Sequence, residues 1–149
     1  MASAATTRGK KISGHKRHLL VDTLGLLLAV LVHPADVQDR DGAKALLSRV
    51  RRRLPRLQVI WADGAYAGQL IGWVKQTCGW LLQTVLRPVG VHGFVVLPKR
   101  WVVERTFAWL TRYRRFARDY EYLTTNSETL IQIAMIHLMS RRLLPGSPT

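Results

Sequence analysis

The sequence has 149 residues, of which 48% are hydrophobic, so it can bury one core and is not a disordered basic tail. Lysine and arginine number 23 against 9 acidic residues, and the net charge of +14 favours nucleic acid as partner. A basic surface with no catalytic meaning is the alternative reading of this charge. The single cysteine, Cys78, excludes an internal disulfide and a thiolate zinc cluster. With no signal peptide and no apolar run long enough to cross a bilayer, we expect a cytoplasmic protein without a membrane partner.

The first half of the chain predicts an arm, a hairpin and a helix. Residues 1–16 are small, polar and basic, which predicts a flexible arm. "HLLVDTLGLLLAVLV" follows, with two apolar runs around the turn residues Asp22 to Gly25, and this predicts a β-hairpin whose second strand ends at Pro34. The apolar spacing after Gly42 predicts an amphipathic helix that ends before Pro55.

The middle of the chain alternates between strand and helix patterns. "LQVIWAD" predicts a short strand that ends at Asp63, and "AGQLIGWVKQTC" predicts a helix that Gly79 closes. "WLLQTVL" predicts another strand. Strands that alternate with helices predict an α/β domain over residues 17–144, in which helices cover a mixed sheet.

Two helices are expected to complete the chain. The first runs from Arg100 to about Arg118, and the second from about Asn126 to Arg142. Thr125 and Glu128 have the spacing of a capping box at the start of the second helix. That helix is apolar almost all round, which predicts a buried helix, and residues 145–149 are expected to be a disordered tail.

The helix from Arg100 has an apolar half, which we expect to face the core, and a basic half with Glu104 near its centre. A carboxylate among phosphate-binding groups is what a divalent metal site on nucleic acid requires. The alternative is an Arg100–Glu104 ion pair on a solvated helix, which contributes only a few tenths of a kcal/mol. The residues predicted to bind DNA are Lys99, Arg100, Arg105, Arg112 and Arg115.

Asp63 is the second acid of interest, because it follows an apolar strand and precedes a glycine. Ligands gather at the carboxyl ends of strands in α/β sheets, so Asp63 and Glu104 together are candidate ligands of one or two Mg²⁺ ions at a phosphodiester. A helix cap or turn is an equally good reading of Asp63 from spacing alone. His15 and His18 lie in the basic segment without acidic or cysteine partners, and we expect them to contact nucleic acid or solvent.

Four blocks of sequence resemble the transposases of bacterial insertion sequences of the IS5 group, within the IS4-like class. They are "GHKRHLLVDTLGLLLAVLVHPADVQDRDGA", "IWADGAYAG", "GFVVLPKRWVVERTFAWL" and "RFARDYEYL", and the resemblance extends from about Gly9 to Leu144. It implies a ribonuclease H-like fold and a catalytic triad of two aspartates and a glutamate that binds Mg²⁺ or Mn²⁺. Such enzymes cut DNA at the ends of the element with water, and the freed 3′-hydroxyl then attacks target DNA.

The resemblance assigns two of the three acids. "DGAY" matches the D-G-x-[YF] block of the family, which gives Asp63 the role of the second aspartate and Tyr66 the aromatic position. Arg100 and Glu104 match the Y-x-x-R-x-x-x-E-x-x-x-x-x-x-K pattern of the family. The chain departs from this pattern at Leu97 and Thr111, which stand where Tyr and Lys are expected.

The first aspartate of the family lies on the strand that precedes the hairpin, and no acidic residue occurs here before Asp22. Asp22 itself has the place of a hairpin-turn residue. We therefore expect an N-terminally truncated catalytic domain without its first strand, as a truncated copy or as the second part of a product joined by frameshifting. We likewise expect the helical DNA-binding region that precedes the catalytic domain of such transposases to be absent.

Three functions are compatible with these residues. The leading one is a transposase catalytic-domain fragment that acts on insertion-sequence ends and target DNA and is nearly inactive alone, because one carboxylate is lost. The second is a non-catalytic DNA-binding or subunit-poisoning regulator of full-length transposase, and the third is a decayed remnant. Expected partners are DNA, a second copy or a full-length transposase, in the bacterial nucleoid.

Overall fold

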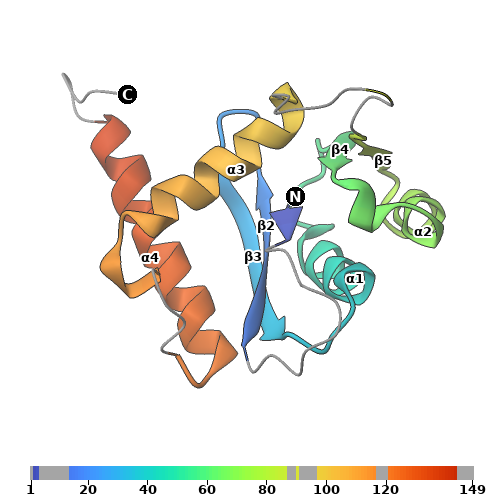
Figure 1. Cartoon of the computed structure of the whole chain (residues 1–149). Coiled ribbons are helices and arrows are strands. Elements are labelled where there is room, and N and C mark those ends of the chain that lie inside the picture. The colour runs from blue at the N-terminus through green and yellow to red at the C-terminus, as the bar shows by residue number, and fades with distance from the viewer. Residues whose placement is uncertain (1, 4–13, 87–89, 91–96, 117–120, 144–149) are drawn as a thin grey trace.

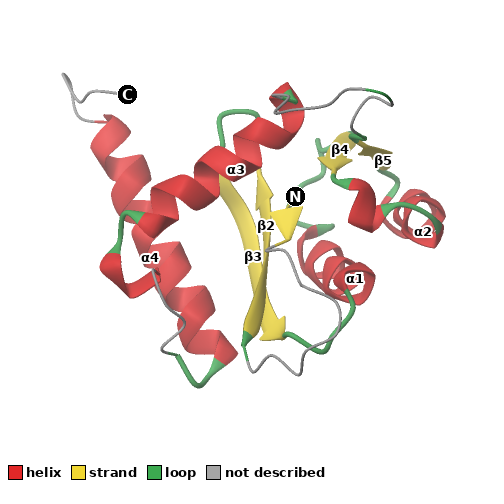
Figure 2. Cartoon of the chain, viewed as in Figure 1, coloured by secondary structure: helices red, strands yellow, loops and turns green. Residues whose placement is uncertain are grey.

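A computed structural model describes residues 2–3, 14–86, 90, 97–116 and 121–143. A central hairpin lies between helix α4 on one side and helix α1 on the other, and helix α3 crosses the end of the hairpin near its turn (Figure 1). A smaller unit of two strands and helix α2 lies beyond α1 (Figure 2). Among the described residues, none of the helices has the length and apolarity needed to cross a membrane.

The hairpin has the predicted form. Strands β2 (His15–Val21) and β3 (Leu27–Pro34) pair antiparallel, and β3 ends at the expected proline. Asp22 builds the turn, because its Oδ1 accepts hydrogen bonds from the N–H groups of Leu24 and Leu26. Gly25 adopts φ +82° in this turn, a conformation that favours glycine. Asp22 is thus the turn residue that the sequence predicts.

Part of the segment 1–16, which is predicted to be a flexible arm, belongs to the sheet. A two-residue strand β1 (Ala2–Ser3) pairs antiparallel with Leu19 and His18 of β2, and β2 itself begins at His15. Residues 4–13 of the arm and the predicted tail 145–149 lie outside the described residues.

Helix α1 (Asp39–Val50) begins three residues before the predicted start. Asp39 and Asp41 lie in its first turn, where negative charge is favourable at a helix N-terminus. Asp39 also pairs with Lys16 of β2, at 3.2 Å between Nζ and Oδ1. The sequence pattern misses this turn because its residues are polar and carry no apolar period. The side chains that α1 buries are Ala43, Leu46, Leu47 and Val50.

Strands β4 (Val59–Ala62) and β5 (Leu81–Thr84) pair parallel, and the short 3₁₀ helix η1 (Gly64–Tyr66) and α2 (Gln69–Cys78) connect them. Gly79 closes α2 in the left-handed conformation, as expected. The described strands form two sheets, the antiparallel β1–β3 and the parallel β4–β5, where the sequence predicts one mixed sheet. They stay separate because no described strand lies between β2 and β4.

Helix α3 (Pro98–Thr111) ends before the predicted Arg118. The chain tightens after Thr111 into the 3₁₀ turn η2 (Arg114–Phe116), which carries Phe116 into the core beside α4. Burial of this aromatic ring outweighs one more turn of exposed helix. Residues 117 and 118 lie outside the described residues.

Helix α4 (Thr124–Leu143) corrects two predictions. Its outer face exposes Ile133 and Ile136, so the helix is buried along one face and not all round. The capping box is also wrong, because Thr125 lies inside the helix and the Glu128 carboxylate has other partners. Its Oε1 accepts from the Val32 N–H at 2.8 Å and its Oε2 pairs with Arg49 at 3.4 Å. Glu128, which the local spacing assigns to a helix cap, thus bonds instead to β3 and to Arg49.

Successive residues of the hairpin enter two different cores. Leu20 and Leu31 pack with α1, α2 and the β4–β5 sheet. Leu19, Val30 and Val32 pack with α3, Phe116 and α4 on the opposite face. Side chains alternate across a strand, so a continuous apolar run is the pattern of a strand buried on both faces.

Candidate functional site

Asp63 follows β4 and starts the turn into η1. Its Oδ1 accepts a hydrogen bond from the Ala65 N–H at 2.9 Å, and its backbone oxygen accepts from the Tyr66 N–H at 3.2 Å. The side chain is half-buried. The turn-capping role that spacing alone allows is therefore present, and it uses one of the two carboxylate oxygens.

Tyr66 ends this turn fully buried, and its hydroxyl lies 2.9 Å from Nδ1 of His18. Nε2 of His18 in turn lies 2.5 Å from Nε2 of His33, and the two rings are stacked. Nδ1 of His33 lies 2.8 Å from the carbonyl oxygen of Pro34. A hydrogen-bond chain thus runs from the end of the Asp63 turn across the hairpin.

The direction of this chain follows from its last member. A carbonyl oxygen only accepts, so His33 carries a proton on Nδ1. With Nε2 of His33 as acceptor, His18 donates from Nε2, and its free Nδ1 accepts the Tyr66 hydroxyl proton. In this arrangement His18 holds one proton and is neutral.

Burial, with the nearby His33 as a smaller cause, lowers the pKa of His18 from 6.5 to about 4. The neighbouring Asp39 acts in the opposite direction and Lys16 in the same one, both more weakly. His18 is therefore neutral at physiological pH, which agrees with the arrangement in which it donates to His33 and accepts from Tyr66.

The expectation that His18 contacts nucleic acid or solvent is wrong, because its side chain is fully buried. The two-residue period of side chains along a strand could have predicted this burial. His18 lies two residues before Leu20, and His33 lies two residues after Leu31, so all four share the face that packs on α1. The basic residues around His18 hide this period when the sequence is scanned for charge.

Glu104 lies on the exposed side of α3, with its side chain 49% accessible. Nη2 of Arg100 is 3.3 Å from its Oε1, which is the i,i+4 ion pair that spacing alone allows. The helix faces are as predicted, because Val103, Thr106 and Leu110 are buried while Arg100 and Glu104 are exposed.

The predicted DNA-binding residues differ in their contacts. Lys99 lies over the Trp61 ring, with Nζ 4.3 Å from the ring centre. Arg105 donates to the carbonyl of Leu24 at 2.9 Å and also lies over Trp109, so it ties α3 to the hairpin turn.

The remaining two arginines follow Thr111. Arg115 pairs with Glu121 at 2.8 Å, whereas Arg112 is exposed, and the described part of the chain provides it no ion pair. Among the residues predicted to bind DNA, Arg112 is thus the arginine whose charge is most available to an outside phosphate.

The structure brings the two elements of the candidate metal site together without joining its two acids. Helix α3 packs against β4, and the Lys99–Trp61 contact lies two residues before Asp63 and five before Glu104. The Asp63 carboxylate accepts a hydrogen bond from the Ala65 N–H, and the Glu104 carboxylate pairs with Arg100. These are contacts within each element and do not link the two acids. Across the described residues, no group of three His, Cys, Asp or Glu side chains is placed to hold a metal ion. The donor type suits Mg²⁺, but two carboxylates are an incomplete set.

Comparison with family models decides the classification. The model described as the transposase DDE domain matches residues 2–139. The chain belongs to this transposase family. The match covers β1 to α4 and includes Asp63, Tyr66 and Glu104.

A relative from Burkholderia cepacia, described as a candidate transposase for insertion sequence element IS402, is 29% identical over 115 residues. This alignment covers 72% of the chain and 54% of the relative. The recognition of an insertion-sequence transposase is thus confirmed at the level of the DDE family. The assignment to the IS5 group stays a prediction.

The cryo-EM structure of the simian T-cell lymphotropic virus intasome, in complex with the PP2A regulatory subunit B56 gamma, contains a similar fold. Its TM-score is 0.54 at 19% identity, and the match covers 90% of this chain and 45% of that chain. This likeness confirms the predicted ribonuclease H-like α/β fold. The chain spans about half the length of both proteins.

Two helical glycines provide a matched test of the histidine pair. A Cβ on Gly42 of α1 would overlap the ring nitrogens of His33 and His18, whereas a Cβ on Gly72 of α2 would meet open space. We expect Gly72→Ala to raise the free energy of unfolding by up to about 1 kcal/mol, through helix propensity. Gly42→Ala is expected to lower it by about 1–3 kcal/mol, through overpacking. Urea denaturation measures both, and a stabilising Gly42→Ala would contradict the close packing.

Acid is expected to destabilise the fold through His18. Its pKa of about 4 lies below the unfolded value of 6.5, so the unfolded chain binds the extra proton between these pH values. Stability from this group is present above pH 6.5 and is lost as pH falls toward 4, by about 2 kcal/mol between pH 7 and 5. Urea denaturation at several pH values measures this slope. His18→Gln should reduce it and the exposed His137→Gln should not, so equal slopes in all three proteins would contradict the assignment.

Proposed function

We propose that this chain is the catalytic portion of a DNA transposase, with Asp63 and Glu104 as two of its metal-binding carboxylates. The match of the transposase DDE domain to residues 2–139 is the observation that carries the proposal. Within this match, Asp63 directly follows β4, and Glu104 lies on the helix that packs against that strand. The reaction class is phosphodiester cleavage by water at insertion-sequence ends, followed by attack of the 3′-hydroxyl on target DNA.

Each residue has a distinct proposed role. Asp63 and Glu104 supply carboxylate oxygens to Mg²⁺ or Mn²⁺, which when bound polarises the phosphodiester. Tyr66 and its histidine chain hold the Asp63 turn against the hairpin. The basic side of α3 and the turn after it, above all Arg112, bind the DNA backbone.

The proposal includes a dependence on a further acid. With two carboxylates the ligand set is incomplete, so we expect the chain alone to be nearly inactive in cleavage and strand transfer. The proposed partners are DNA, a second copy of the chain and a full-length transposase at the nucleoid, and of these the full-length transposase is the one that would carry the further aspartate. The family match covers the catalytic domain, which favours this function over a regulator without a catalytic role.

Binding of a fluorescent DNA duplex over a series of salt concentrations tests the DNA-binding face. Phosphate contacts release counterions, so affinity should fall steeply with salt. Arg112→Gln should weaken binding to all sequences alike and reduce the salt slope by about 1. The exposed Arg52→Gln, on the α1–β4 connection, is the matched control and should leave the slope unchanged. Equal effects of the two variants would show that general basicity, not this face, binds DNA.

Electron paramagnetic resonance of free Mn²⁺ tests the metal ligands without requiring activity. Asp63→Asn and Glu104→Gln should each weaken Mn²⁺ binding by at least about ten-fold, because each removes a negative oxygen donor. Asp36→Asn, in the exposed loop before α1, is the control and should bind Mn²⁺ as the unmodified chain does. Unchanged binding in the Asp63 and Glu104 variants would exclude this ligand pair.

A further inference from the structure

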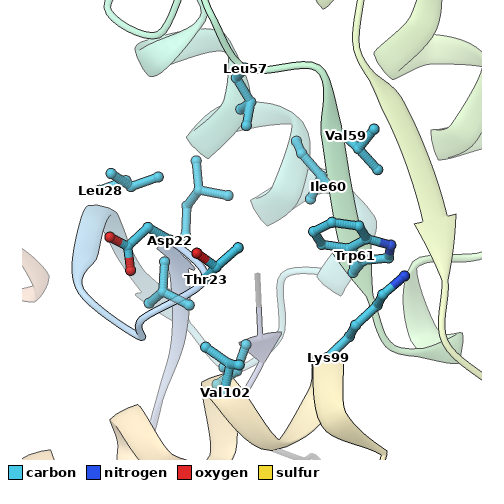
Figure 3. A pocket seen from close by; sticks show the side chains of 12 residues that line it. Asp22, Thr23, Leu28, Leu57, Val59, Ile60, Trp61, Lys99 and Val102 are labelled. Atoms are coloured by element: carbon cyan, nitrogen blue, oxygen red, sulfur yellow. The ribbon is translucent and has the colours of Figure 1, made fainter.

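Tryptophan rings hold basic side chains near both ends of helix α3. At its N-terminal end, Lys99 reaches along the ring of Trp61, and both residues line an apolar pocket (Figure 3). Toward its C-terminal end, two guanidinium groups lie over the ring of Trp109. Cζ of Arg105 is 5.0 Å from the ring centre, and Cζ of Arg142 is 4.4 Å from it. Both distances are within the range of cation–π attraction, so Trp109 gathers positive charge from α3 and α4 together.

The spacing of residues on α3 places this cluster in one row. Arg105, Trp109 and Arg112 are spaced i, i+4 and i+7, and residues with this spacing share one side of a helix. Glu104 precedes the row by one position, so it lies about 100° round the helix from Arg105. The row is thus a basic strip beside the candidate metal ligand, and Arg142 joins it from α4.

The charge of this strip is not neutralised within the described part of the chain. None of the ion pairs there includes Arg105, Arg112 or Arg142. Nε of Arg105 is also buried without a hydrogen-bond partner among these residues, while its Nη2 donates to the carbonyl oxygen of Leu24. Like charges on one ring repel each other, and an anion beside them offsets this repulsion. The strip therefore favours an anionic ligand.

Arg142 has the geometry to bind a phosphate. Its side chain is exposed, and a guanidinium that stacks on an aromatic ring keeps its N–H donors in the plane of the stack. These donors form a fork that matches two oxygens of one phosphate. Because the Trp109 ring already holds the group in place, less conformational entropy is lost on binding than for a freely moving side chain.

The two tryptophan-held groups are separated by a distance that suits duplex DNA. Lys99 and Trp109 are ten residues apart, which corresponds to about 15 Å along a helix. A duplex advances about 3.4 Å for each base pair, so this length covers about four base pairs. A duplex that meets Lys99 and Glu104 can therefore extend along α3 as far as α4.

We propose that Arg105, Trp109 and Arg142 form a clamp for a backbone phosphate of duplex DNA, separate from the phosphodiester that meets Asp63 and Glu104. Arg142 donates to the phosphate oxygens, and Arg105 adds its charge. Trp109 is a positioning residue, because it holds the guanidinium groups and does not itself bond to the phosphate. The clamp rests on the proposed function, since it takes DNA as the substrate, and it adds α4 to the DNA-binding face.

Binding of a fluorescent DNA duplex to the full chain, over a series of salt concentrations, tests the clamp. Arg142→Gln should reduce the salt slope by about 1, because one phosphate contact is lost. Arg142→Lys keeps the charge and should keep the slope. The neighbouring exposed Arg141→Gln is the matched control on α4 and should also leave the slope unchanged. A role of Arg142 limited to packing α4 against α3 would leave the slope unchanged in every variant.

A spectroscopic signal from the ring locates the contact. In a chain labelled with fluorotryptophan, the fluorine resonance of Trp109 can be identified by its loss in Trp109→Phe. This resonance should shift when the duplex is added, because the phosphate binds beside the ring. The resonance of Trp80, which is buried in the core beside α2, should not shift.

The outcomes separate the clamp from the proposed function. Equal salt slopes in Arg142→Gln and Arg141→Gln would overturn the clamp, and so would a Trp109 resonance that DNA does not move. If Arg112→Gln still reduced the slope in that case, the DNA-binding face would stand without Arg142. A chain that binds no duplex at low salt would contradict both proposals.

Discussion

The burial of the β2–β3 hairpin on both faces is the constraint on which the rest of the structure depends. Leu20 and Leu31 need α1 and the β4–β5 unit to cover them, and Leu19, Val30 and Val32 need α3 and α4. Covering each face removes apolar surface from water, and this burial stabilises the fold by roughly 25 cal/mol for each Å² of apolar surface buried. The Glu128 carboxylate then accepts the Val32 N–H and ties α4 to the strand it covers.

The same hairpin positions the residues of the candidate site. On one face, His18 and His33 anchor Tyr66, which ends the turn that begins at Asp63. Near its turn, Thr106 and Arg105 of α3 bond to the carbonyls of Gly25 and Leu24, and this fixes the helix that carries Glu104. The two acids thus belong to different elements that are oriented by one strand pair.

The positive charge of the chain is divided between structure and surface. Lys16 pairs with Asp39, Arg105 bonds to the hairpin turn and Arg115 pairs with Glu121. The count of 23 lysines and arginines therefore overstates the number of basic side chains that are free to contact phosphate. Arg112, exposed beyond the end of α3, keeps its charge available.

The sequence by itself determined the hairpin and its turn, the strand–helix–strand order from β4 to β5, the exposed and buried faces of α3, and the motifs of the transposase family. Local physics governs these features, because side-chain period, turn chemistry and residue spacing act within a few positions. Only the tertiary structure decided the burial of His18, the partners of Glu128, the early end of α3 at Thr111 and the separation of the two sheets. Each of these depends on a residue distant in sequence: His18 on Tyr66, Glu128 on Val32, and Phe116 on the α4 core. Local propensity contains no term for such contacts, and their burial and hydrogen-bond energies outweigh it.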